Sequence, residues 1–257
     1  MVGRLLRSMG RAVLDWLGAL GHATLFLLEA LRQAFLPPYR FRRLLEEIHF
    51  IGWKSGLIIL LTAAFTGMVL GLQGYYTLRK YGSESALGSA VALSLIRELG
   101  PVLTALMVSG RAGSAITAKI GIMRISEQLD ALESMAVNPV QYVVTPKLVA
   151  GLICVPLLTA IFDVVGILGG YVVGVWLLGV GSGVYFSGIS QSVVALDVNG
   201  GVVKSLVFGL TVITVSCYKG YFTPRGAEGV SRATTEAVVS SAVLVLAWDY
   251  VLTSFFM

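Results

Sequence analysis

The chain has 257 residues, of which 56% are hydrophobic and only 13% are charged, and its formal net charge is +5. Soluble domains carry about 25% charged residues, and the mean hydropathy here is +0.84, so the composition excludes an ordinary soluble domain. Since a helix needs about 20 apolar residues to cross a bilayer, the length allows five or six spans in an all-α integral membrane protein.

The first 54 residues are less apolar than the rest and amphipathic. Residues 11–36 have apolar positions at helical spacing but are interrupted by acidic residues and a histidine, so they either lie on the membrane or form a sixth, poorly apolar span. Residues 40–54 place apolar side chains on one helical face and charged ones on the other, a pattern typical of a helix in the membrane interface. We therefore assign residues 1–54 to N-terminal cytoplasmic or interfacial helices.

The rest of the chain contains five strongly apolar segments. Each is long enough to span a bilayer if internal charges are accepted in four of them. The expected spans are about 55–78, 86–109, 148–178, 200–218 and 237–257.

Lysine and arginine residues are distributed unevenly between the two sides of these spans. Residues 1–54 carry eight, 111–147 carry four and 219–232 carry three, whereas 79–85 carry two and 179–199 carry none. By the positive-inside rule, the N-terminus is predicted to be cytoplasmic and the C-terminus to lie outside. The same excess accounts for the pI near 9.3, so we expect no nucleic-acid partner.

Five charged residues lie inside the predicted spans: Arg97, Glu98, Asp163, Lys204 and Asp249. A charge at the bilayer centre costs about 2.5–3.5 kcal/mol on insertion scales, so these groups must pair with one another or face a polar cavity. They either form salt bridges that only fix helix packing or mark the site of a polar cargo. Lys204 lies near the outer end of its span, where it either snorkels to the surface or offers a cation to an anionic headgroup.

The cytoplasmic segment 109–147 is too long for a bare linker. Residues about 115–135 interleave apolar and charged positions at helical spacing. We predict an amphipathic helix that either docks into a groove of a soluble partner or rests on the lipid headgroups.

Glycines recur every four residues in two of the spans. Gly166, Gly170 and Gly174 form such a run in the third span, and Gly67 and Gly71 in the first. Small residues at this spacing let helix backbones approach closely. We therefore predict a packing role for them.

Motifs for catalysis, nucleotide binding and metal binding are absent from the sequence. It contains no GxxxxGK[ST] loop, no HExxH, no GxSxG and no paired-cysteine motif. The two histidines, His22 and His49, lack metal-ligand spacing. We therefore expect no metal site, no cofactor and no enzymatic activity in this chain.

Three segments resemble the MlaE/YrbE family, the permease subunits of ABC systems that work with MCE-domain proteins. They are GMVLGLQGY (67–75), ALSLIRELGPVLTALMVSGRAGSAITAKIGIMRISEQLDALESMAVNP (92–139) and GVSRATTEAVV (229–239). The resemblance covers most of the chain and is weakest in the N-terminal segment and the outer loop 179–199.

This resemblance implies a five-span permease domain over residues 55–257 in the inner membrane of a Gram-negative-type bacterium. Two copies would enclose a central cavity and bind two ABC ATPase subunits, which hold the ATP and magnesium. A small STAS-domain subunit and a hexameric MCE-domain protein on the periplasmic side would complete the assembly. The implied cargo is glycerophospholipid, moved between the inner membrane and the MCE tunnel to maintain outer-membrane lipid asymmetry.

The resemblance also implies roles for individual residues in the cargo site. Arg97 and Lys204 would contact the lipid phosphate, and Glu98 would orient Arg97 and limit how tightly the phosphate is held. Asp249 would belong to the charge network, whereas the family pattern assigns nothing to Asp163. Further candidate substrate-binding residues are Tyr81, Gln73, Leu70, Leu78, Leu93 and Val102.

The predicted helix at 115–135 would be the coupling helix that fits the ATPase. Glu127 would lie at its centre. The other residues expected to contact the ATPase are Arg124, Gln128, Asp130 and Glu133.

Two other functions compete with this interpretation. In an ion-coupled secondary transporter, Glu98, Asp163 and Asp249 would carry protons, but such folds often show internal repeats and this sequence has no convincing one. In a non-transporting anchor for MCE proteins, the charges would be purely structural. Coupling to an ATPase would distinguish the three functions.

Overall fold

The computed structural model describes residues 18, 21–37 and 40–256, and within these residues the chain is helical without strands. Five helical runs are long and apolar enough to cross a membrane, which confirms the predicted all-α, multi-pass architecture. The runs are Phe41–Arg79, Glu84–Ile125, Val140–Leu177, Ala195–Tyr221 and Ala227–Phe255.

The first three runs extend beyond the predicted spans because α-helices join through π-helical turns. The first run comprises α2 (Phe41–Ile48), η1 (His49–Trp53) and α3 (Lys54–Arg79), so the amphipathic segment continues directly into the first span. The third comprises η5 (Val140–Val144), α8 (Thr145–Tyr171) and η6 (Val172–Leu177). The second run comprises η2 (Glu84–Ala86), α4 (Leu87–Ser94), η3 (Leu95–Leu99), α5 (Gly100–Val108), η4 (Ser109–Gly113) and α6 (Ser114–Ile125).

Pro101 follows η3 and lies in the first turn of α5. Proline has no N–H to donate to the carbonyl four residues earlier, which is the carbonyl of Arg97. That carbonyl accepts a hydrogen bond from Lys204 Nζ at 2.9 Å instead. The local break in the helical ladder is therefore filled by a side chain from another helix.

The remaining helices are α9 (Ser182–Ser192), α10 (Ala195–Tyr221) and α11 (Ala227–Phe256). The sequence did not predict α9, which packs on α4. Its buried Tyr185 donates a hydrogen bond to the carbonyl of Ile167 at 3.0 Å, and burial raises the pKa of Tyr185 to about 12.

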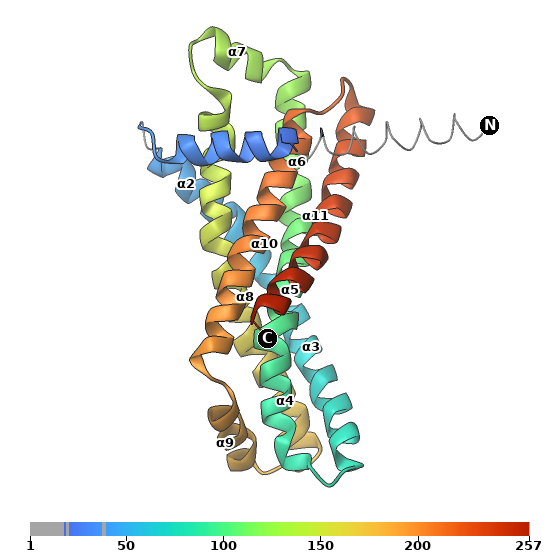
Figure 1. Ribbon diagram of the computed structural model, residues 1–257. Coiled ribbons are helices and arrows are strands. Elements are labelled where there is room, and N and C mark those ends of the chain that lie inside the picture. Colours follow the sequence, from blue (N-terminus) through green and yellow to red (C-terminus); the bar gives the residue numbers. More distant parts are fainter. Residues whose placement is uncertain (1–17, 19–20, 38–39, 257) are drawn as a thin grey trace, which may run out of the picture.

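The described parts of the segments predicted to be cytoplasmic gather at one end of the molecule (Figure 1). The helix over residues 21–34 lies across this end, near the short helix α7 (Gln128–Ser134), and α9 lies at the opposite end. The helix over residues 21–34 runs across the direction of the long helices (Figure 1), which favours the surface position over a sixth span. The rest of the predicted 11–36 segment falls partly outside the described residues.

Helices α3 and α8 pack backbone to backbone through glycines. A Cβ atom on Gly67 would lie 1.8 Å from the carbonyl oxygen of Gly166, and one on Gly71 would lie 3.0 Å from that of Gly170. Gly174 lies against α4 instead, where a Cβ atom on it would lie 2.7 Å from Leu87 Cδ2. The glycine run thus contacts two neighbouring helices in turn.

Replacing Gly67 with alanine is expected to destabilise the fold by about 3 kcal/mol, at the upper end of overpacking costs, because the clash is with backbone that cannot rotate away. Thermal unfolding of the detergent-purified protein measures the effect. Gly56→Ala is the matched control, since nothing lies within 4 Å of its Cβ position in the same helix. Equal melting temperatures for the two variants would contradict the close packing.

Candidate functional site

One face of α10 contacts the π-helical turn η3 that carries Arg97 and Glu98. Asp197, Gly201 and Lys204 are spaced four and three residues apart, so they lie on the same face of the helix. A Cβ on Gly201 would lie 2.5 Å from the carbonyl oxygen of Ile96. Glycine at this position therefore lets α10 approach η3 closely enough for its charged neighbours to reach Arg97 and Glu98.

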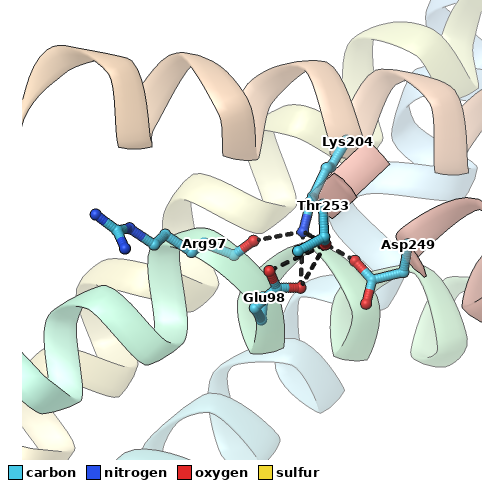
Figure 2. Close-up of polar contacts among 5 residues, drawn as sticks. All are labelled: Arg97, Glu98, Lys204, Asp249 and Thr253. Atoms are coloured by element: carbon cyan, nitrogen blue, oxygen red, sulfur yellow. Dashed lines mark hydrogen bonds and ion pairs between the residues drawn. The ribbon is translucent and has the colours of Figure 1, made fainter. Parts of the chain in front are cut away.

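Lys204 is buried at the centre of a polar network whose carboxylates are partly exposed (Figure 2). Its side chain is only 3% exposed. Its Nζ lies 2.7 Å from Glu98 Oε2, 3.0 Å from Asp249 Oδ1 and 2.7 Å from Thr253 Oγ1, in addition to the carbonyl of Arg97. An ammonium has three donors, so these four acceptors saturate it. The prediction that Lys204 snorkels to the surface is therefore wrong. The contact between Lys204 and a phosphate stays a prediction, and it requires the ammonium to release one of these four partners.

The side chain of Arg97 points away from this network (Figure 2). Its Nε donates to Asp197 Oδ1 at 2.8 Å, and its side chain is 43% exposed. The expectation that Glu98 orients Arg97 is wrong, because both Glu98 oxygens accept hydrogen bonds from Lys204 or Thr253. Adjacent residues on a helix point in different directions, so Arg97 and Glu98 reach different partners.

A cavity of about 310 Å³ opens beside the ion pairs of Arg97 and Lys204. It brings together three predicted site residues, Arg97, Glu98 and Lys204, and it is also bordered by Asp197 and Thr253. The cavity lies between η3, α10 and the last turn of α11. The other lining residues are Val194, Leu196, Gly200 and Gly201.

The remaining predicted substrate-binding residues do not line this cavity. Gln73 and Tyr81 are exposed on or just after α3, whereas Val102 is buried in the core. Periodicity identifies the faces of a helix but not which helices meet, so it could not show that η3 faces α10. The residues outside this cavity are Leu70, Gln73, Leu78, Tyr81, Leu93 and Val102.

Sequence reasoning missed Asp197 and Thr253. Asp197 fell in a segment read as the outer loop, yet it is the third residue of α10 and accepts a hydrogen bond from the N–H of Val194. An acidic residue in the first turn of a helix that also lies seven positions before Lys204 was the available signal. Thr253 lies one helical turn after Asp249, and this spacing was a weaker sequence signal.

Asp163 does not join the network. Its Oδ1 has no hydrogen-bond partner among the described residues. A Cβ on Gly100 would lie 1.8 Å from this oxygen, so Asp163 of α8 packs against the start of α5. Four of the five charges inside the spans are thus paired through η3, α10 and α11, and the fifth lies apart.

The family model described as Permease MlaE matches residues 44–255. The chain belongs to the MlaE permease family. The resemblance seen in the sequence is therefore confirmed, and the match covers all five helical runs almost completely.

Relatives of this MlaE-family permease align over most or all of its length. A probable ABC transporter permease protein of Rickettsia bellii is 41% identical over 256 residues, which is 100% of this chain and 99% of that protein. The intermembrane phospholipid transport system permease protein MlaE of Haemophilus influenzae is 44% identical over 255 residues, 99% of this chain and 98% of that protein. A chloroplastic protein of Arabidopsis thaliana, TRIGALACTOSYLDIACYLGLYCEROL 1, is 34% identical over 84% of this chain and 61% of that protein.

The predicted coupling segment of this MlaE-family permease is divided into two helices. α6 ends at Ile125 and α7 begins at Gln128, with Glu127 between them in a left-handed conformation at φ 59°. Arg124 Nη1 and Asp130 Oδ1 pair across the corner at 2.7 Å. The range 115–135 is therefore a helical corner with Glu127 at its bend, rather than one continuous helix.

The residues predicted to contact an ATPase are mostly exposed around this corner. Glu127, Gln128, Asp130 and Glu133 face solvent, whereas Leu129 is fully buried and attaches α7 to the rest of the fold. Arg124 is half-buried. The corner thus presents acidic side chains on a short helix that a buried leucine holds in place.

Proposed function

We propose that this chain is the membrane permease subunit of an ABC transporter that moves glycerophospholipids between the inner membrane and a periplasmic MCE-protein tunnel. The observation that carries the proposal is a half-exposed arginine beside a cavity within the helical bundle. A guanidinium in contact with lipid tails is costly, but a phospholipid offers it a phosphate, and guanidinium groups bind phosphate oxygens through two parallel N–H donors. The name of the Haemophilus influenzae relative supports the same cargo.

The proposed assembly contains two copies of the chain. Helix α11 is the least buried of the five spans, and α3 exposes apolar side chains along most of its length. These faces offer surface for lipid and for a second copy, which would bring candidate substrate-binding residues such as Gln73 and Tyr81 toward the cargo. In this assembly the chain maintains outer-membrane lipid asymmetry. Its N-terminus is cytoplasmic and its C-terminus periplasmic, as the distribution of lysine and arginine predicts.

ATP hydrolysis is proposed to come from partner ATPase subunits that bind the ATP and magnesium. The names of the Rickettsia relatives as ABC transporter permeases support such partners. The acidic corner at Glu127 is the proposed docking point, because it is exposed and rigidly attached through Leu129. A STAS-domain subunit on the cytoplasmic side and a hexameric MCE-domain protein on the periplasmic side complete the proposal.

Replacing Arg97 with glutamine tests this function. We expect the phospholipid retained per purified complex to fall by about tenfold, because a charge-assisted hydrogen bond to phosphate is lost. Mass spectrometry of the extracted lipid measures the retention, and transfer between vesicles measures transport. Arg79→Gln is the matched control, because Arg79 lies at the exposed outer end of α3, away from the cavity. Normal lipid retention and transport by Arg97→Gln would refute the proposal.

A further inference from the structure

We infer that Asp197 is a positioning residue for Arg97, which aims the guanidinium at the cargo phosphate and weakens its hold enough for release. The inference rests on the proposed function, because it assumes that Arg97 meets an anionic group in the cavity. It assigns to Asp197 the role that was expected for Glu98, which is to orient Arg97 and to limit how tightly the phosphate is held. Nothing in the family resemblance or in the relatives' names points to Asp197.

The geometry of the pair leaves the phosphate-binding edge of Arg97 available. Only Nε donates to Asp197, at 2.8 Å. Neither Nη group makes a hydrogen bond within the part of the chain that the structure describes. A guanidinium is planar with its donors in a fixed fork, so anchoring it through Nε fixes the direction in which the two Nη groups point. Two phosphate oxygens can then bind that edge in parallel.

Asp197 is itself held rigidly. Its side chain is 8% exposed, and its second oxygen accepts the N–H of Val194 at 3.1 Å. One carboxylate therefore fixes both the first turn of α10 and the direction of Arg97. Because Gly201 brings α10 against the backbone of Ile96, the carboxylate cannot follow Arg97 if the arginine moves toward the cargo.

The charge of Asp197 also opposes cargo binding. An anion that reaches Arg97 approaches a guanidinium whose charge is already partly balanced, so the attraction is smaller than for a lone arginine. Glu98 cannot perform this role in the observed arrangement, because its carboxylate is bonded to Lys204 and Thr253. Asp197 is the carboxylate that offsets the charge of Arg97 while leaving its Nη groups free for the phosphate.

Two substitutions at this position separate charge from shape. Asp197→Asn removes the charge and keeps one acceptor, so that Arg97 can keep its partner while the N–H of Val194 loses its own. Asp197→Glu keeps the charge and both acceptors and supplies the residue most often found at this place in a capping box. We expect Asp197→Asn to retain about fivefold more phospholipid per complex and to transfer it more slowly between vesicles. We expect Asp197→Glu to stay close to the unmodified protein in both measurements.

The measurements use the full detergent-purified complex, equilibrated with micelles of phosphatidylethanolamine and phosphatidylglycerol and then reconstituted into vesicles of the same lipids. Glu236→Gln is the matched carboxylate-to-amide control, because Glu236 pairs with Lys219 and Arg232 at the other end of α10 and α11. Its lipid retention and transfer should be unchanged.

A purely structural role would lower lipid retention and transport together in Asp197→Asn, and this result, like an absence of any change, would overturn the inference. If Asp197→Asn does not fold, the double variant Arg97→Gln/Asp197→Asn is measured instead, because removing both charges leaves no unpaired charge at this contact. It should then match Arg97→Gln, and a further loss of retention would assign Asp197 to structure only. Normal retention by Arg97→Gln would refute the proposed function itself, whatever Asp197 does.

Discussion

Replacing Lys204 with alanine is expected to destabilise the folded protein by about 3 kcal/mol. Removing one partner of a buried ion pair costs about 3–5 kcal/mol, because it leaves an uncompensated charge. Lys204 is 3% exposed and holds both Glu98 and Asp249. The partial exposure of Glu98, at 35%, lets solvent relieve part of the cost, so we place the effect at the lower end of this range.

The melting temperature of the detergent-purified protein measures this loss. Lys219→Ala is the matched control, because Lys219 pairs with Glu236 while remaining about one-third exposed, and such pairs contribute about 1 kcal/mol or less. Adding Glu98→Gln and Asp249→Asn to Lys204→Ala should recover most of the stability, since the orphaned charges are then gone. A melting temperature of Lys204→Ala equal to that of Lys219→Ala would contradict the role of Lys204 as the centre of the network.

Reversing the charge at Glu127 is expected to abolish the coupling between ATP hydrolysis and lipid transfer. Glu127→Lys changes the charge by two units at the bend of an exposed acidic corner. A partner surface complementary to this acidic corner would then face a like charge, which costs several kcal/mol. Co-purification of the ATPase and ATP-dependent transfer between vesicles measure the effect. A transporter driven by an ion gradient would be indifferent to this change.

Glu127→Gly separates the backbone from the charge. Glycine adopts the left-handed conformation of this position without strain, so the corner should be preserved while the side chain is removed. We expect Glu127→Gly to remain folded and to lose coupling only partly. If Glu127→Lys kept full coupling, the corner would not be the docking point for the ATPase.

The sequence was sufficient to predict the five spans, because each has a long apolar run that only a membrane helix explains. It could not predict the exact extent of these runs. Amphipathic and apolar segments join through π-helical turns such as η1, and one extra residue in such a turn rotates the following helical face by about 100°. Faces read from periodicity on one side of the turn cannot be extended to the other.

The sequence also identified Arg97, Glu98, Lys204 and Asp249 as special, since charges within apolar runs need partners. It could not identify which charges pair. Arg97 and Glu98 are neighbours in sequence yet bond to opposite ends of a seven-residue interval on α10. This pairing depends on the close approach at Gly201, which is a property of two backbones rather than of any local pattern.

The alternation of charge along this contact has a mechanical consequence. Displacing α10 lengthwise by one turn, about 5.4 Å, would separate Lys204 from Glu98 and Asp249, and a two-turn slip would set Lys204 against Arg97 or Asp197 against Glu98. Sliding between α10 and η3 is therefore electrostatically costly, and α11 is joined to the same contact through Asp249 and Thr253. We therefore expect these three elements to move together during a transport cycle.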